Sequence, residues 1–243
     1  MIDSLLNYRL RAAESSAGIS GESIYRMAHA AIHQYGLHGD LLEYGAGTGS
    51  LILRLEKERL FSTITGADIL GRPEALPAEM TWLQADLNEP LPCGHGSYDT
   101  IVSTEVIEHL ENPRAAFREF HRLLRPGGTL IVTTPNQESL RSLLCFAVHG
   151  HFAAFRDASY PAHITALLST DFIRICSETG FDPPIFLYSD SGGLPGFPQF
   201  LWQRVSAAIC RGKWFSDNFG LVARRSLEMA TPSAGQSLSA PPS

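Results

Sequence analysis

A glycine-rich turn between an apolar run and an amphipathic segment limits how this chain can fold more than any other feature. The stretch reads Leu-Leu-Glu-Tyr-Gly-Ala-Gly-Thr-Gly-Ser over residues 41–50. Glycine is needed where a ligand touches the backbone, because a Cβ atom would occupy the ligand's place. We therefore expect a strand over residues 41–44, a ligand-contacting turn, and a helix that continues from it.

The spacing of the glycines disfavours a dinucleotide as the ligand. The dinucleotide fingerprint is G-x-G-x-x-G/A, but counting from Gly45 the sixth position is Ser50, and the third glycine, Gly49, comes one place early. Glu43 would also bring a carboxylate near a pyrophosphate, which is electrostatically unfavourable. The same carboxylate is favourable beside an amino group or a sulfonium. A nicotinamide-dependent oxidoreductase on a similar sheet stays the enzymatic alternative.

Short apolar runs alternate with helical patterns along most of the chain. This alternation predicts an α/β fold with a doubly wound, Rossmann-like, mostly parallel sheet. The predicted strands are residues 41–44, 62–67, 81–85, 100–102, 129–133, 185–188 and 219–223. The predicted helices are residues 23–35, 48–59, 105–110, 113–124, 138–148, 170–179 and 200–211.

Three carboxylates follow three successive predicted strands. Glu43 precedes the glycine turn, Asp68 ends the second strand, and Asp86 follows the third with Leu87 beside it. Asp68 is placed to accept hydrogen bonds from both hydroxyls of a ribose, and Asp86 is placed to meet an adenine amino group. Because the carboxyl ends of parallel strands form the ligand crevice, we expect all three at one site.

These motifs, together with the stretches at residues 98–110 and 124–130, resemble the class I S-adenosylmethionine (SAM)-dependent methyltransferases, in particular the ubiquinone-pathway O-methyltransferases. The resemblance covers about residues 36–136 and implies SAM as the cofactor and a reversed last strand in a sheet of seven. It assigns the methionine part of SAM to the glycine turn. It assigns the ribose and the adenine to the ends of the second and third predicted strands, and the site beneath the sulfonium to the end of the fourth. The implied cofactor-binding residues are Glu43, Tyr44, Gly45, Ala46, Gly47, Gly49, Asp68, Ile69, Asp86, Leu87, Ser103 and Thr104.

Glu105, Glu108 and His109 are spaced i, i+3 and i+4, which on a helix would project them from one face. With His163 they form a candidate site for a divalent cation such as Mg²⁺, as in the more distantly similar small-RNA 2'-O-methyltransferases. A structural alternative has Glu105 capping the helix and His109 buried. Without a metal, His109 or His163 is the expected general base, since imidazole titrates near neutral pH, and Glu105 is a further catalytic candidate.

The division that we expect is a helical cap over residues 1–36, a methyltransferase domain over 37–229, and a disordered tail over 230–243. Acceptor specificity is expected in the leading cap and in segments 137–170 and 190–218. Residues 197–215 carry aromatic and basic side chains, which favours a lid over the site, with peripheral membrane contact as the alternative.

Charge and composition narrow the partners. The 19 Lys and Arg against 25 Asp and Glu lack the electrostatic footprint of a nucleic-acid binder. The four cysteines lie far apart in the sequence, which gives no reason to expect disulfides. No apolar run is long enough to span a bilayer, and together these features favour a cytoplasmic protein. We expect O-methylation of a small-molecule, sugar or lipid-linked hydroxyl. An RNA 2'-O-methyltransferase and a non-catalytic SAM-binding partner protein are the further alternatives.

Overall fold

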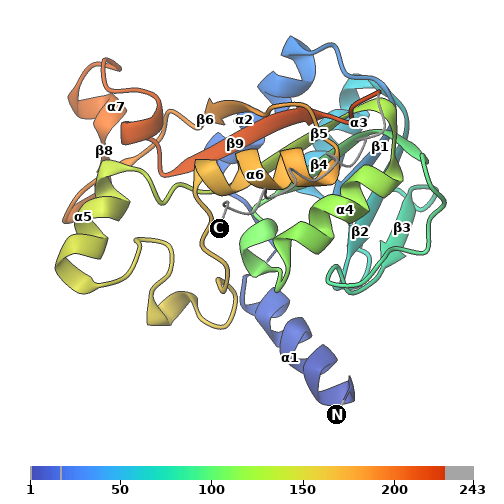
Figure 1. The fold of residues 1–243 in the computed structure, drawn as a ribbon, viewed down its shortest axis with the longest axis horizontal. Helices are drawn as coiled ribbons and strands as arrows, with labels where there is room; N and C mark the ends of the chain where they lie inside the picture. The colour runs from blue at the N-terminus through green and yellow to red at the C-terminus, as the bar shows by residue number, and fades with distance from the viewer. Residues whose placement is uncertain (1, 17, 228–243) are drawn as a thin grey trace, which may run out of the picture.

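The computed structural model describes residues 2–16 and 18–227, and its centre is a seven-stranded sheet (Figure 1). The strand order is β3-β2-β1-β4-β5-β9-β6, and β9 runs antiparallel to both of its neighbours. The predicted sheet with a reversed last strand is thereby confirmed. The strands are β1 Gly39–Tyr44, β2 Phe61–Asp68, β3 Thr81–Gln84, β4 Tyr98–Thr104, β5 Leu124–Pro135, β6 Ile185–Tyr188 and β9 Asn218–Arg224. The predicted tail, 230–243, lies outside the described residues.

Helices cover both faces of this sheet. Helices α2 (Glu22–Gln34) and α3 (Ser50–Glu58) pack on one face, and α4 (Pro113–Leu123) and α6 (Ser169–Thr179) on the other (Figure 1). Successive strand residues point to opposite faces, so each strand feeds both layers. The layer with α2 and α3 contains the strand residues Leu41, Val102 and Ile131. The layer with α4 and α6 contains their sequence neighbours Leu42, Ile101 and Leu130.

Local signals explain where the helices begin and end. The Asn112 side chain accepts a hydrogen bond from Ala115 N at 3.0 Å, and Pro113 is the first residue of α4. Helix α6 ends at Gly180, which adopts a φ of 85° that a residue with a Cβ rarely adopts.

Two predicted helices are wrong. Residues 105–110 form only a short 3₁₀ turn, η1 (Ile107–His109), because Glu105 takes a φ of 56° that no helix continues. Residues 200–211 form the end of a hairpin, β7 (Gly193–Leu194) and β8 (Phe197–Leu201), followed by the single turn α7 (Trp202–Val205). Positive φ values at Ala207 and Ala208 stop that turn from extending.

The remaining elements lie outside the two helical layers. They are α1 (Ile2–Ser15), which extends apart from the sheet in Figure 1, α5 (Leu140–His149), η2 (Asp157–Ser159) and η3 (Lys213–Phe215). Within the described ranges, no helix has the length and apolarity needed to cross a bilayer. Of these elements, α1, α5 and η2 contribute residues to the site.

Candidate functional site

A cavity of about 320 Å³ opens at the carboxyl ends of β1, β2 and β4. This volume lies within the range of small-molecule sites. Its floor is the glycine turn with residues 68–70 and 86–88, and residues of α1 and of segment 158–164 line its other walls. No described residue between 190 and 216 lines it, so the predicted lid over residues 197–215 does not cover this cavity.

The glycine turn has no room for side chains. A Cβ on Gly45 would lie 2.2 Å from Val106 Cγ2, and one on Gly47 would lie 2.2 Å from the carbonyl oxygen of Gly18. Both glycines also have positive φ values, 83° and 50°. Gly47 N donates to Asp68 Oδ2 at 2.7 Å, which ties the turn to the end of β2. The backbone itself therefore forms this wall of the cavity.

Glu43 and Asp68 bring carboxyl groups to the same wall. Glu43 is 2% exposed, and its Oε2 has no hydrogen-bond partner among the described residues. Burial raises the pKa of Glu43 well above its ordinary value, and burial also raises that of Asp68. Asp68 is held on its second oxygen by Leu70 N at 2.9 Å. A ligand that brings a donor or a positive charge would satisfy the unpaired oxygen of Glu43.

Asp86 closes the far side of the cavity together with a residue from α1. Arg9 Nη1 donates to Asp86 Oδ2 at 2.6 Å, and its Nε and Nη2 donate to the two carboxylate oxygens of Glu111 at 3.0 and 2.8 Å. The Asn88 backbone and side-chain nitrogens donate to Asp86 Oδ1. A carboxylate offers about four lone-pair sites, so Asp86 keeps one for an incoming amino group.

The other residues that the family resemblance implies divide into two groups. Ala46, Ile69, Leu87 and Thr104 line the cavity with the residues above. Tyr44, Ser103 and Gly49 do not. Strand alternation turns Tyr44 into the core on the opposite face, where its hydroxyl donates to Leu87 O at 2.6 Å. Ser103 is fully buried, and Gly49 precedes the first residue of α3. Tyr44, Ser103 and Gly49 therefore lie behind the cavity wall.

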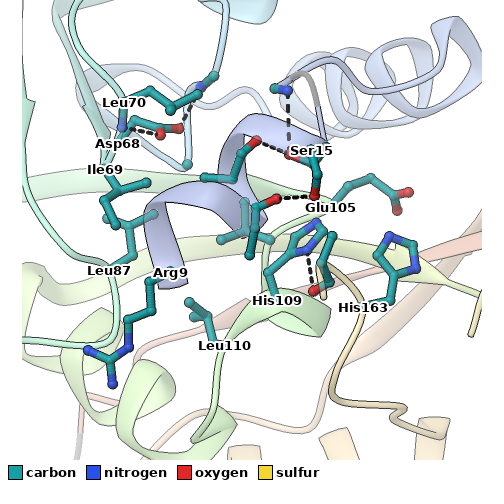
Figure 2. Close-up of a pocket in the computed structure, with 18 of the residues that line it drawn as sticks. Arg9, Ser15, Asp68, Ile69, Leu70, Leu87, Glu105, His109, Leu110 and His163 are labelled. Carbon is teal, nitrogen blue, oxygen red and sulfur yellow. Dashed lines mark hydrogen bonds between the residues drawn. The ribbon is translucent and has the colours of Figure 1, made fainter. Parts of the chain in front are cut away.

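Two imidazoles meet at the opposite end of the cavity from Arg9 (Figure 2). The rings of His109 and His163 lie 5.0 Å apart between centroids. Each Nδ1 donates to a backbone carbonyl at 2.7 Å, that of Ala162 for His109 and that of Ala154 for His163. Burial lowers the pKa of both histidines, and each neutral ring therefore carries its lone pair on Nε2.

The two glutamates of the cluster are each held by a polar side chain beside these rings. Glu108 is fully buried, accepts a hydrogen bond from Thr134 Oγ1 at 3.1 Å, and has its pKa raised by burial to about 8. Glu105 accepts from Asn218 Nδ2 at 3.0 and 3.1 Å, and its pKa is raised by burial and by Glu108. The ligand atoms of Glu108, His109 and His163 lie within 4.8 Å of one another, without Glu105. The helical-face geometry predicted for this cluster is wrong.

A second cavity of about 330 Å³ adjoins the first. Glu105, Ser159 and His163 line both cavities. The second is lined chiefly by polar side chains, namely Asn136, Gln137, Ser139, Arg141, Ser142, Arg156, Asp217 and Asn218. Gln137 is 1% exposed, and among the described residues its Oε1 has no partner. The second cavity therefore suits a polar molecule that offers a hydrogen-bond donor.

Sequence reasoning placed acceptor specificity partly in the leading cap but did not single out the residues of that cap that close the site. Arg9 and Tyr8 lie on α1, and the Tyr8 hydroxyl donates to that of Tyr160 at 2.9 Å. A helical stretch with scattered polar residues carries no signal for such contacts. Gln137, just after β5, and Asn218, at the start of β9, fall within the predicted acceptor-side segments 137–170 and 190–218, but neither was singled out as a polar residue at a strand end on the crevice side.

Comparison with known proteins shows the family to which the chain belongs. The chain matches a protein-family model described as a methyltransferase domain over residues 20–183. It is 33% identical over 129 residues to a malonyl-[acyl-carrier protein] O-methyltransferase of Hahella chejuensis. The aligned region covers 51% of this chain and 44% of that protein. It is 31% identical over 124 residues to a ubiquinone biosynthesis O-methyltransferase of Vibrio parahaemolyticus, with 47% and 51% covered.

The chain thus spans about half the length of the curated relatives that it matches. Among solved structures, a SAM-dependent methyltransferase from Archaeoglobus fulgidus superposes with a TM-score of 0.57 at 14% identity. That match covers 82% of this chain and 94% of the other. At this identity the likeness concerns the fold, which agrees with the strand order described above.

Proposed function

The chain belongs to the class I SAM-dependent methyltransferases, and we propose that it transfers a methyl group from SAM to an oxygen of a polar, hydroxyl-bearing acceptor. The single observation that carries this proposal is that His163 and Glu105 line both cavities. One cavity has the features that SAM requires. The other is polar and adjoins it at a basic nitrogen, where an acceptor hydroxyl would have to lie.

The first cavity fits SAM by the chemistry of its walls. The unpaired, buried oxygen of Glu43 suits the amino group of the methionine part, and the glycine turn lets that part lie on the backbone. Asp68 would hold the ribose, and Asp86 with Leu87 the adenine. When bound, SAM supplies an electrophilic methyl group on a positively charged sulfur.

His163 is the residue that we assign to proton removal. Its Nδ1 proton is held by Ala154 O, so Nε2 is free to accept the proton of an acceptor hydroxyl. His109 lines only the first cavity, and its ring packs edge to face against that of His163. Most of the remaining rate enhancement would come from holding the acceptor oxygen in line with the methyl group.

The oxygen specificity rests on two supports. A neutral imidazole suits a hydroxyl that must lose its proton, whereas a neutral amine is already nucleophilic. Two of the similar proteins are named as O-methyltransferases, one in ubiquinone biosynthesis and one for malonyl-acyl carrier protein. The polar second cavity disfavours a purely apolar acceptor, and the net charge of -6 disfavours RNA.

The test is calorimetry followed by product analysis. We expect SAM and S-adenosylhomocysteine to bind one per chain and NAD not to bind, and we expect S-adenosylhomocysteine to form with one or more members of a panel of catechols, sugars and hydroxy acids. Binding of NAD instead of SAM would support the oxidoreductase. Binding of SAM with no turnover on any hydroxyl compound, but with turnover on amines, would overturn the assignment to oxygen.

Chelation of divalent cations is expected to leave the rate of methyl transfer unchanged. One carboxylate oxygen of Glu108 already accepts a hydrogen bond from Thr134, and two imidazole nitrogens are poor ligands for Mg²⁺, which prefers oxygen. The measurement is the initial rate before and after treatment with EDTA. A loss of activity that added Mg²⁺ or Zn²⁺ restores would instead assign a catalytic metal to Glu108, His109 and His163.

Replacing Arg9 by alanine is expected to release α1 from the adenine side of the cavity. The Arg9 contacts to Asp86 and Glu111 join α1 to two loops, and charge-assisted hydrogen bonds of this kind contribute about 1.5–3 kcal/mol each when not fully exposed. Stopped-flow measurement should show S-adenosylhomocysteine leaving at least about tenfold faster, which is about 1.4 kcal/mol. The control is Arg11→Ala, an exposed arginine on the same helix. Equal dissociation rates in both variants would contradict this role.

A further inference from the structure

A separate group of side chains with metal-ligand chemistry lies between α2 and α3. His29 and His33 are one turn apart on α2, and Glu58 is the last residue of α3. Their ligand atoms all lie within 4.8 Å of one another, and none of the three residues lines either cavity. This group is therefore independent of the proposed methyl transfer.

Three short contacts converge within this group. His29 Nε2 lies 2.5 Å from Glu58 Oε1, His33 Nε2 lies 2.8 Å from Glu58 Oε2, and the two Nε2 atoms are 3.2 Å apart. Protons can satisfy only two of these contacts at a time. If both rings donate to Glu58, two N–H groups face each other, and if one ring accepts from the other, it loses its bond to Glu58.

We propose that His29, His33 and Glu58 form a binding site for a divalent transition metal, with Zn²⁺ as the ion that they fit. A cation at the centre would accept a lone pair from each of the three groups and so resolve the conflict between their protons. For tetrahedral Zn²⁺ with bonds of 2.0–2.1 Å, two ligand atoms are about 3.3 Å apart, close to the 3.2 Å between the nitrogens. The carboxylate oxygens need to move outward by only a fraction of an ångström.

The exposure of the three side chains fits such a site. They are 34%, 48% and 34% exposed for His29, His33 and Glu58, so an ion can enter from solvent and keep water in its fourth position. Two histidines and one carboxylate favour Zn²⁺, Cu²⁺ or Ni²⁺ over Mg²⁺ or Ca²⁺, which take oxygen ligands.

The position of the site gives the ion a structural consequence. Arg54 of α3 already donates to both carboxylate oxygens of Glu22 on α2, at 2.8 and 2.6 Å, and a metal would add a second link between these helices. Helix α3 continues from the glycine turn, and the residues before α2 pack on that turn through Gly18. Glu58 lies at the far end of α3 from that turn, so a bound ion would stabilise the packing of α2 against α3 without entering the cofactor cavity.

The experiment is calorimetric titration of the full chain with Zn²⁺ after treatment with EDTA and removal of the chelator. We expect a site that His33→Ala and Glu58→Gln each weaken at least about tenfold, since changing even residues that only orient metal ligands costs about 10–100-fold. Matched controls are His38→Ala, a nearby exposed histidine, and Glu56→Gln, an exposed glutamate on α3. Both controls should bind Zn²⁺ as the unchanged chain does.

Thermal melting gives an independent readout and guards against misfolded variants. Zn²⁺ should raise the melting temperature of the unchanged chain and of the controls, and should raise that of Glu58→Gln by less than half as much. The proposal is overturned if the four variants bind Zn²⁺ alike, or if only His163→Asn loses it. In either case the group at α2 and α3 is a hydrogen-bonded clamp and any zinc lies elsewhere.

Discussion

Replacing Gly47 by alanine is expected to weaken SAM binding by about a hundredfold or more. The added Cβ would lie 2.2 Å from the Gly18 carbonyl oxygen, and the φ of 50° costs a residue other than glycine roughly 1–2 kcal/mol. Relief of the clash would also break the bond from Gly47 N to Asp68 Oδ2, at roughly 1–3 kcal/mol. The free turn can avoid these costs only by leaving the position in which it lines the cavity, and restoring that position on binding would cost about 3 kcal/mol, or two powers of ten in affinity.

Calorimetry with SAM and with S-adenosylhomocysteine measures this effect. The matched control is Gly71→Ala, since a Cβ at Gly71 would have no atom within 4 Å and its φ is not positive. Should Gly47→Ala fold poorly, Asp68→Asn removes the charged partner of the same bond with little change of shape and should also weaken binding. Full affinity in both Gly47→Ala and Asp68→Asn would show that the turn does not bind the cofactor.

The core of the site was predictable because it is encoded locally. The glycines and the acids at residues 43, 68 and 86 stand at strand ends, and parallel strands bring such ends to one edge of a sheet. The alternation of predicted strands and helices along the sequence was therefore enough to locate the cofactor cavity, and no long-range contact had to be known. The family resemblance also implied Tyr44, but strand alternation turns this side chain to the opposite face, away from the cavity.

The rest of the site depends on contacts that no local pattern records. The bond between Asn218 and Glu105 joins residues 113 apart, and the contact of Arg9 with Asp86 joins residues 77 apart. Glu105 itself was read as helical because its spacing to His109 is helical, whereas the turn after β4 takes a left-handed residue there. The second cavity exists only once β5, β9 and segment 153–159 have come together.

Replacing His163 by asparagine is expected to reduce kcat by about 10²–10⁴ at neutral pH, the usual contribution of a general base, while the affinity for SAM changes little. The asparagine amide can still donate to Ala154 O as Nδ1 does, but it has no basic nitrogen to accept the proton. Single-turnover kinetics with an acceptor from the panel and calorimetry with SAM separate the two effects. The control is His151→Asn, since His151 lines neither cavity.

The pH dependence of kcat supplies the decisive part of this test, because a purely structural role of His163 would not produce it. Burial and the neighbouring His109 lower the pKa of His163 below its ordinary 6.5. The base must be neutral to act, so kcat should stay constant around pH 7 and fall only as the pH drops through this lowered pKa. In His163→Asn the residual rate should lose that acid limb. If His163→Asn keeps both its rate and its acid limb while His109→Asn loses them, the proton goes to His109, and the acceptor must then enter through the first cavity.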